Sequence, residues 1–269
     1  MRGRVSGPLA PVDALRVRAG ARHAAHDEAV VECPVALLYN GQSHAVMMAT
    51  PHDLADYALG FALSEGIVAT PAEFALVDTV VHDGGIALHA AIPQARFDAL
   101  QSRRRSVNGP SGCGLCGVES LDAALRPVPA VAPARPVDAA SVHAAVRALA
   151  GLQPLNARSG GVHAAAFVHD RGLLVREDVG RHNALDKLIG AMAAPGSPLD
   201  PHAGFAVMTS RASYELVHKA ATAGIAMLVA MSAPTDLAVR TAQAAGLTLV
   251  GFARDDGFNV YTHPGALRG

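Results

Sequence analysis

The sequence has few cysteines, no long hydrophobic segment and almost no net charge, and each absence excludes a class of protein. Three cysteines are too few, and odd in number, for the disulfide framework of a small secreted domain. No apolar segment follows Arg2 and Arg4, so we expect no secretory signal. The longest apolar stretch, 220–231, is shorter than the roughly 20 residues of a transmembrane helix. A formal net charge of −1 gives no general case for nucleic-acid binding. We therefore expect a cytoplasmic protein without a membrane or nucleic-acid partner.

The main chemical feature that is present is a pair of cysteines among glycines. Cys113 and Cys116 lie within residues 108–117, which contain four glycines and one proline, and this composition predicts a loop. Thiols presented on a loop suit reactive chemistry, and the arginines at 103–105 would favour the nucleophilic thiolate. Cys33 lies in an apolar stretch and is expected in the core instead.

Two other uses of these thiols are disfavoured. A Cys₂His₂ zinc site would need Cys113, Cys116, His163 and His182, whose spacing is wide and irregular, so we expect no metal site. A thioredoxin-type redox pair begins a helix directly after a strand, whereas this pair is surrounded by glycines.

The first half of the chain divides into a flexible tail over 1–26, an α+β domain over 27–107, and a cysteine loop and proline-rich linker over 108–136. In the α+β domain, an Asn40-Gly41 turn predicts a hairpin. The expected elements are strands over 29–39 and 44–50, a helix over 54–65, a second hairpin over 74–82 and 85–92, and a short helix from 93 to about 100.

Residues 137–269 predict a second domain in which strands and helices alternate. The expected helices span 138 or 141 to 149, 182–192, 213–223 and 235–245. The expected strands span 164–169, 172–175, 205–209, 226–231, 248–252 and 259–262. Two of these strands are apolar throughout, as strands covered on both faces are. The predicted fold class is therefore α/β, with a mixed sheet and flanking helices beside a smaller N-terminal α+β unit.

Polar residues follow four strands of this sheet, where ligands bind in such folds. The segments 176–183, 210–213, 232–236 and 253–257 would form a rim for phosphate or carboxylate, with Arg181, Arg211 and Arg254 at corresponding positions. Simpler explanations remain. Helix capping would explain the hydroxyl residues, and surface ion pairs with Asp178, Glu215 and Asp255 would explain the arginines. The possible capping residues are Ser210, Ser213, Ser232 and Thr235.

Four segments carry a resemblance to a known family. They read Asn-Gly-x-x-Gly-Cys-Gly-Leu-Cys-Gly at 108–117, Glu-Asp-Val-Gly-Arg-His-Asn-Ala-Leu-Asp-Lys-Leu-Ile-Gly at 177–190, Thr-Ser-Arg-Ala-Ser-Tyr-Glu-Leu-Val-His-Lys-Ala at 209–220, and Gly-Phe-Ala-Arg with Asn-Val-Tyr-Thr-His-Pro at 251–264. Together they resemble the FdhD/NarQ family of formate dehydrogenase accessory proteins, over about residues 28–264.

This resemblance implies a dimeric sulfurtransferase. A cysteine desulfurase would pass sulfur to the cysteine loop as a persulfide, with Cys113 the favoured carrier and Cys116 its assistant. The sulfur would then go to the molybdenum or tungsten of a bis(molybdopterin guanine dinucleotide) cofactor destined for formate dehydrogenase. The alternative is a non-catalytic chaperone that binds this cofactor. The resemblance also implies a cytidine-deaminase-like second domain, but His163-Ala164-Ala165 lacks the glutamate that deamination needs.

The guanosine diphosphate moieties of that cofactor need a site, which we predict at the end of the strand over 248–252. Phe252 would stack on the purine, Arg254 would pair with phosphate, and an aspartate would accept hydrogen bonds from guanine. The predicted set is Phe252, Ala253, Arg254, Asp255, Asp256, Gly257, Ser210, Arg211, Ser232 and His182. The structural alternative is a polar turn before a final strand.

Overall fold

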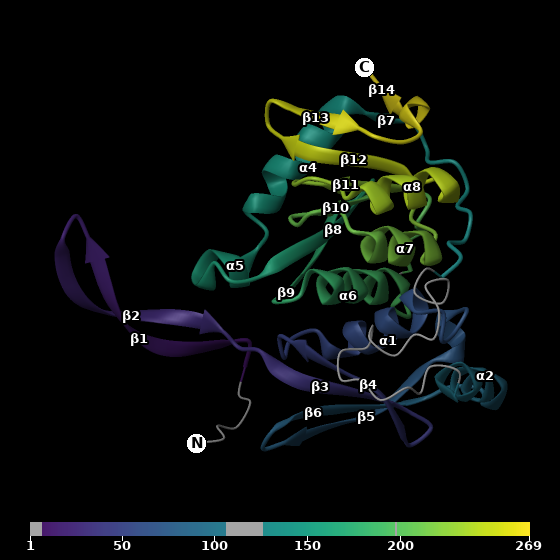
Figure 1. The fold of residues 1–269 in the computed structure, drawn as a ribbon, viewed down its shortest axis with the longest axis horizontal. Helices are drawn as coiled ribbons and strands as arrows, with labels where there is room; N and C mark the ends of the chain where they lie inside the picture. The colour runs from purple at the N-terminus through teal and green to yellow at the C-terminus, as the bar shows by residue number, and fades with distance from the viewer. Residues whose placement is uncertain (1–6, 106–125, 197) are drawn as a thin grey trace.

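The computed structural model describes residues 7–105, 126–196 and 198–269 and shows an α/β fold, as predicted. Figure 1 shows a smaller unit below a larger one, and a long hairpin that extends away from both. The smaller unit contains a four-stranded sheet and the larger unit a six-stranded sheet.

The smaller unit contains the two predicted hairpins, and its sheet has the strand order β4-β3-β6-β5 with β3 and β6 parallel. Positive φ angles at Asn40 (48°) and Gly41 (81°) form the predicted turn. Burial alternates along β3, so one face of the sheet packs on α1 and carries the core of this unit. The elements are β3 (Cys33–Tyr39), β4 (Gln42–Ala49), α1 (Leu54–Ser64), η1 (Pro71–Glu73), β5 (Ala75–His82), β6 (Gly85–Ala91) and α2 (Gln94–Arg105).

The larger unit is built on a mixed sheet with the order β13-β12-β11-β10-β8-β9. Strands β10, β11 and β12 are parallel, whereas β8 is antiparallel to both β9 and β10, and β13 is antiparallel to β12. The strands are β8 (His163–His169), β9 (Gly172–Asp178), β10 (Phe205–Met208), β11 (Met227–Ala230), β12 (Thr248–Arg254) and β13 (Gly257–Val260), with the short pair β7 (Val137–Asp138) and β14 (Leu267–Arg268) beside them.

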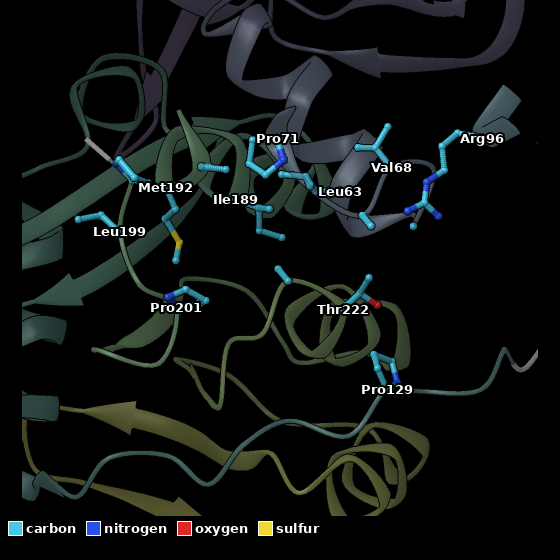
Figure 2. A pocket seen from close by; sticks show the side chains of 15 residues that line it. Leu63, Val68, Pro71, Arg96, Pro129, Ile189, Met192, Leu199, Pro201 and Thr222 are labelled. Atoms are coloured by element: carbon cyan, nitrogen blue, oxygen red, sulfur yellow. The ribbon is translucent and has the colours of Figure 1, made fainter. Parts of the chain in front are cut away.

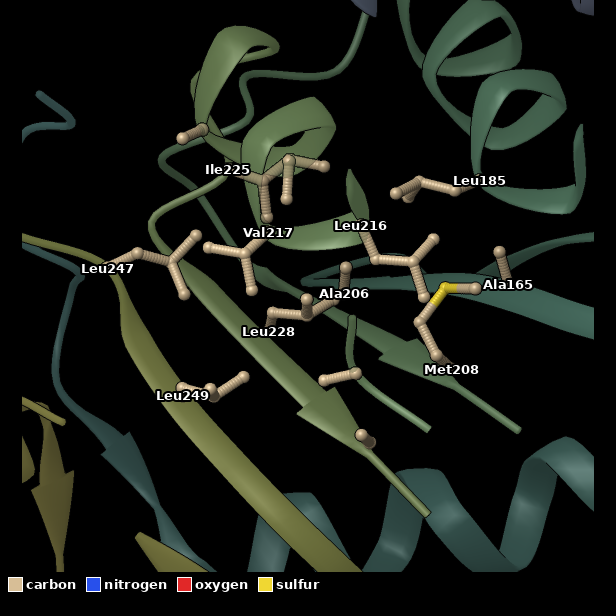
Figure 3. Packing of buried hydrophobic residues seen from close by; sticks show 14 of the residues in the cluster. Ala165, Leu185, Ala206, Met208, Leu216, Val217, Ile225, Leu228, Leu247 and Leu249 are labelled. Atoms are coloured by element: carbon tan, nitrogen blue, oxygen red, sulfur yellow. The ribbon is translucent and has the colours of Figure 1, made fainter. Parts of the chain in front are cut away.

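Helices cover both faces of this sheet. On one face α6 (Arg181–Ala193), α7 (Tyr214–Thr222) and α8 (Asp236–Ala245) pack on the core shown in Figure 3, where Leu216 and Val217 of α7 point toward the strands. On the other face α4 (Ala139–Ala150) buries a second core. The strands alternate between the two cores, since Ala206 and Leu228 belong to the first and Val207 and Val229 to the second.

The two units meet where α1 crosses α6 at backbone distance. A Cβ atom added to Gly60 of α1 would lie 1.7 Å from the carbonyl oxygen of Asp186, and one added to Gly190 of α6 would lie 1.9 Å from that of Asp56. Only glycine has room at these two positions. The approach brings Gly190, the last residue of the long 177–190 motif, into the joint between the units.

Two buried lysines and their carboxylate partners reinforce this joint. Lys187 Nζ lies 2.6 Å from Asp178 Oδ2, both side chains are fully buried, and Lys187 also donates to the carbonyl oxygen of Thr50 in the smaller unit. Lys219 Nζ of α7 lies 2.9 Å from Asp186 Oδ1 and 2.7 Å from Glu65 Oε1 at the end of α1. The charges are compensated by partners on several elements, so loss of one partner would leave the other charged in the interior.

The structure corrects several predicted boundaries. The flexible tail over 1–26 is wrong for the described residues, because β1 (Leu9–Arg18) and β2 (Ala21–Val30) form an antiparallel hairpin. The predicted strand over 29–39 is split, since β2 ends at Val30 and β3 begins at Cys33. Strands β9 and β12 extend beyond their predicted ends, because their last residues are polar and were expected in loops. Helix α5 (Pro154–Ser159) and the full length of α2 were not predicted. Cys33 is buried, as predicted, and burial is the main cause that raises the pKa of its thiol.

Candidate functional site

The strand ends that were predicted to form a rim do lie at one edge of the six-stranded sheet. Strands β10, β11 and β12 are parallel, and β9 runs in the same direction because β8 is antiparallel to both β9 and β10. Their carboxyl ends therefore share one edge, which also carries His163, the first residue of β8. This edge is the candidate site predicted from the sequence.

Neighbouring loops bring most of the predicted rim residues into a row. The backbone N–H of Phe252 donates to the carbonyl oxygen of Ser232 at 3.1 Å. The loop of Arg211 lies beside that of Ser232, because Ala212 and Pro234 form a parallel bridge. Ser210 is buried, and its hydroxyl donates to the carbonyl oxygen of Arg211, whereas the Arg211 side chain is exposed.

The turn at 254–257, which was predicted to bind the nucleotide, lies on the α4 side of the sheet edge. Phe252 adopts φ 54° at a bulge and is 41% exposed, and Ala253 is buried in the core beneath α4. The carbonyl oxygen of Arg254 lies 2.9 Å from His143 Nδ1 of α4. Arg254, Asp255 and Asp256 are exposed, with Gly257 beginning β13. The predicted residues thus divide into a group near α4 and a group near α6 and α7.

His182 is the centre of the second group. Its Nε2 lies 2.8 Å from Glu215 Oε2 and 3.4 Å from Ser213 Oγ, the residue that precedes α7. The hydrogen bond from His182 is the main cause that lowers the pKa of Glu215. His163 lies at the same edge, and burial first, then the charge of Arg181, lowers the pKa of His163. This corner therefore combines cationic and imidazole groups at the ends of two helices.

In the predicted rim segment 176–183, the carboxylates of Glu177 and Asp178 stabilise the fold instead of facing a ligand. The carboxylate of Glu177 accepts the backbone N–H groups of Leu155 and Asn156, both at 2.9 Å, where α5 begins. Asp178 accepts from the backbone of Thr50 and Gly180 in addition to its ion pair with Lys187. These two carboxylates belong to β9, and their oxygens are already paired with groups of the protein. The prediction that they belong to a ligand-binding rim is therefore wrong.

Cys113 and Cys116 lie outside the described residues, but the chain on either side of 106–125 is held at one place. Before that segment, Arg103 Nη2 donates to the carbonyl oxygen of Gly66, just after α1, at 3.2 Å. After it, Arg126 Nη2 lies 2.8 Å from the carboxylate of Glu65. One arginine on each side of the segment thus contacts one of two adjacent residues at the end of α1.

A polar pocket of about 140 Å³ adjoins this return point. The Tyr214 hydroxyl donates to the carbonyl oxygen of Arg126, and His218 Nε2 donates to that of Pro127, both at 3.2 Å. The pocket reaches from here to His182 and Asn183 of α6. Its lining residues are Met47, Phe61, Glu65, Arg126, His182, Asn183, Asp186, Tyr214, Glu215, His218 and Lys219.

The charged groups of this pocket shift one another's pKa values. Burial raises the pKa of Glu65, but Lys219 and then Arg126 outweigh it and bring that pKa to about 2. Burial opposes the charge on Lys219, but Asp186 and Glu65 outweigh it, so the pKa of Lys219 is raised. Glu65, Arg126 and Lys219 were not predicted as site residues from the sequence. The spacing of Glu215, His218 and Lys219 was the available signal, because residues three and four apart share one face of a helix.

A larger pocket, of about 500 Å³, contains none of the predicted site residues. Figure 2 shows it between the two units, with Leu63 and Val68 on one side and Ile189, Met192 and Leu199 lining it from the larger unit. Its lining is mostly apolar, and Arg96 there is already paired with Glu73. It offers few groups for polar chemistry.

Within the described ranges no three or more His, Cys, Asp or Glu residues are grouped so that they could hold a metal ion. In the same part of the chain, no helix is long and apolar enough to cross a membrane.

Comparison with known proteins gives a consistent result. The model of the FdhD/NarQ family matches residues 30–268. A protein named sulfur carrier protein FdhD from Xanthomonas campestris pv. campestris (strain B100) is 50% identical, with 98% of this chain and 95% of that protein covered. One of the same name from Bordetella petrii is 50% identical over 94% of this chain and 92% of its own length.

A solved structure shares the fold. It is described as a formate dehydrogenase accessory protein from Desulfotalea psychrophila, and it superposes with a TM-score of 0.72 at 22% identity, covering 97% of this chain and 99% of its own. The sequence resemblance, the matched length and the shared architecture agree, and the chain therefore belongs to the FdhD/NarQ family.

Proposed function

We propose that this protein is a sulfurtransferase that carries sulfur on Cys113, assisted by Cys116, for the maturation of formate dehydrogenase. The Cys113 thiolate attacks the outer sulfur of a persulfide on a cysteine desulfurase. The S–S bond of the donor breaks, the donor leaves as a thiolate, and Cys113 holds the persulfide. The acceptor is the molybdenum or tungsten of a bis(molybdopterin guanine dinucleotide) cofactor, bound as substrate.

The observation that carries the proposal is the anchoring of the chain on both sides of the cysteine segment. Arg103 and Arg126 are held by Gly66 and Glu65, two adjacent residues at the end of α1. The polar pocket, whose lining includes Glu65, Arg126 and His182, lies beside the point where the described chain resumes after the cysteine segment. The names of the relatives, which are sulfur carrier proteins, support the same chemistry.

The exposed rim residues support binding of the guanosine diphosphate moieties. Arg211 and Arg254 are exposed at the sheet edge, and the helices α6 and α7 begin there with no side-chain cap. Backbone N–H groups and arginines at such an edge suit a pyrophosphate. In the proposal Phe252, Arg254 and the neighbouring aspartates hold one part of the nucleotide, and Ser232, Arg211 and His182 line the continuation of the edge.

The first experiment tests the thiols. After incubation with a cysteine desulfurase and cysteine, intact-mass analysis should show an adduct of about 32 Da, the mass of one added sulfur. The Cys113→Ala, Cys116→Ala variant should lack it, and the Cys33→Ala variant, which changes a buried thiol, should retain it. An adduct that persists in the double variant would refute the assignment of the carrier.

The second experiment tests the nucleotide site and separates transfer from a chaperone role. Calorimetry should show tighter binding of guanosine diphosphate than of adenosine diphosphate, and Arg254→Ala should weaken it about tenfold, as expected for loss of a charge-assisted contact. Arg240→Ala, which changes an exposed arginine of α8, is the control.

A chaperone would retain partial activity with both thiols changed to serine, whereas a sulfurtransferase would lose that activity and still bind the nucleotide.

A further inference from the structure

A histidine of α4 holds the turn between β12 and β13, where the proposed function places part of the nucleotide. Figure 1 shows α4, which carries His143, beside the β12–β13 hairpin. His143 Nδ1 lies 2.9 Å from the carbonyl oxygen of Arg254, where the turn begins. Because a carbonyl oxygen can only accept a hydrogen bond, Nδ1 carries the proton and is the donor. Helix α4 therefore holds the incoming side of the turn through this side chain.

The same ring contacts the outgoing side of the turn. The ring centroids of His143 and Phe258, the second residue of β13, lie 5.1 Å apart with an angle of 43° between the planes. This separation is typical of packed aromatic pairs. His143 is half-buried between the two contacts, so one side chain bridges both strands of the hairpin next to the turn.

The turn depends on such contacts because its own residues do not favour its conformation. Arg254 pairs with Gly257, so Asp255 and Asp256 form a two-residue loop. Hairpin loops of this length favour turn types with positive φ at one or both central residues. In the described part of this hairpin, positive φ occurs at Phe252 and not at the two aspartates. Contacts from outside the turn must therefore help to fix it.

The strand that leads into the turn is irregular as well. The pairing of β12 with β13 changes register between Gly251 and Arg254, and Phe252 in this bulge has φ 54°. A residue other than glycine rarely adopts such an angle, and it persists only where the surroundings fix it. Ala253 is fixed by burial in the core beneath α4, and His143 fixes the next residue through its carbonyl oxygen.

We propose that His143 is a positioning residue for nucleotide binding, an inference that rests on the proposed function. By holding the carbonyl oxygen of Arg254, it fixes the backbone from which the Arg254 side chain meets the phosphate. A backbone fixed in advance reduces the conformational entropy that binding must remove. The role needs no charge on His143, because a neutral imidazole also donates from Nδ1. His143 acts through Arg254 and needs no contact with the nucleotide.

Calorimetry with guanosine diphosphate tests the hydrogen bond in the full chain. His143→Phe keeps a ring against Phe258 but has no donor, whereas His143→Asn keeps an N–H donor near the place of Nδ1 but has no ring. His143→Phe should weaken binding about fivefold, as expected for the loss of one hydrogen bond, and His143→Asn by no more than about twofold. His82→Phe, the same change at an exposed histidine of the smaller unit, should leave the affinity unchanged.

Two results of this experiment would overturn the proposal. One is an unchanged affinity in His143→Phe. The other is equal weakening by His143→Phe and His143→Asn, because the donor would then have no role. If the unaltered chain does not bind guanosine diphosphate, the proposed nucleotide site fails and this inference fails with it. If the unaltered chain binds the nucleotide and His143→Phe binds it equally well, this inference fails alone.

The same substitution in an Arg254→Ala background shows through which residue His143 acts. Two residues that act through one another have non-additive effects. Without the Arg254 side chain, His143→Phe should therefore weaken binding by less than about twofold. A histidine that only stabilises the fold would cost the same factor in both backgrounds, and that result would refute the role assigned to His143.

Hydrogen exchange measures the turn in the absence of nucleotide. The backbone amides of residues 252–258 should exchange several-fold faster in His143→Phe than in the unaltered chain, because the turn loses its contact with α4. The amides of the Asn40-Gly41 turn in the smaller unit should exchange at the same rate in both proteins. Unchanged exchange at 252–258 would contradict the proposal, because the turn would then be held without His143.

Discussion

The buried pair of Lys187 and Asp178 allows a quantitative test of the joint between the two units. Both side chains are fully buried with 2.6 Å between Nζ and Oδ2, and Lys187 also donates to the carbonyl oxygen of Thr50. Lys187→Met keeps an unbranched side chain, one atom shorter, but removes its charge. The Asp178 carboxylate would then remain buried with only the hydrogen bonds from the backbone of Thr50 and Gly180 and from the Asn183 side chain.

Removing one partner of a buried ion pair costs about 3–5 kcal/mol. The three remaining donors to Asp178 place this case near the lower end, at about 3 kcal/mol, which is a large fraction of the 5–15 kcal/mol of a typical domain. With a urea dependence of about 3 kcal/mol per molar, the unfolding midpoint should fall by about 1 M. Circular dichroism is the suitable signal, because the chain contains no tryptophan.

The matched control is Arg240→Met. Arg240 pairs with Asp236 at 2.9 Å, but the two side chains are 68% and 83% exposed, so the loss should be at most about 0.5 kcal/mol. Asp178→Asn combined with Lys187→Met should be less destabilising than the sum of the two single changes, since no charge is left unpaired. If Lys187→Met falls within about 1 kcal/mol of Arg240→Met, the pair does not hold the units together as argued.

Three further results are expected. Gly60→Ala should destabilise the protein by about 3 kcal/mol or more in the same urea assay, because its Cβ would lie 1.7 Å from the carbonyl oxygen of Asp186, whereas Gly151→Ala should change little. The pKa of Glu65 is depressed from 4.5 to about 2, so the stability that Glu65 adds over Glu65→Gln should be present in full above pH 4.5, at about 3 kcal/mol, and be lost as the pH falls toward 2. A difference that does not shrink over this range would contradict the charge coupling. Arg126→Ala should slow the onward transfer of sulfur several-fold but change the free energy of unfolding by no more than about 1 kcal/mol, because the ion pair of Arg126 with Glu65 is half-exposed. Arg135→Ala, which changes another arginine of the linker, should affect neither quantity. Equal transfer rates in the two variants would show that the contact between Arg126 and Glu65 has no role in transfer.

Local patterns predicted most elements because their causes are local. The Asn40-Gly41 turn, the alternation along β3 and the end of α1 just before Gly66 each depend on a few consecutive residues. The failures have the same origin. In the β1–β2 hairpin apolar alternation is confined to the short stretch Leu15-Arg16-Val17-Arg18, and β2 has none. Arg176, Glu177 and Asp178 are typical of a loop, but β9 continues through them because partners elsewhere satisfy their charges.

Only part of the candidate site was predictable from the sequence. The cysteine pair stays a prediction from composition. The strand-end residues were predicted from the alternation of strands and helices, and the neighbouring positions of Ser232 and Phe252 agree with that prediction. The polar pocket was not predictable in the same way. Glu65, Arg126 and Lys219 lie far apart in the sequence, and only their packing around the end of α1 brings them together.

The sequence by itself determined the fold class and the family, because periodicity, turn residues and motifs are properties of consecutive residues. Tertiary structure alone decided what the polar residues of the 177–190 motif do. Lys187 binds the backbone of Thr50 across 137 residues of chain, and Gly190 admits the backbone of α1. A charged residue reads the same in a sequence whether it faces water or a buried partner, and only the packing of the two units distinguishes these states.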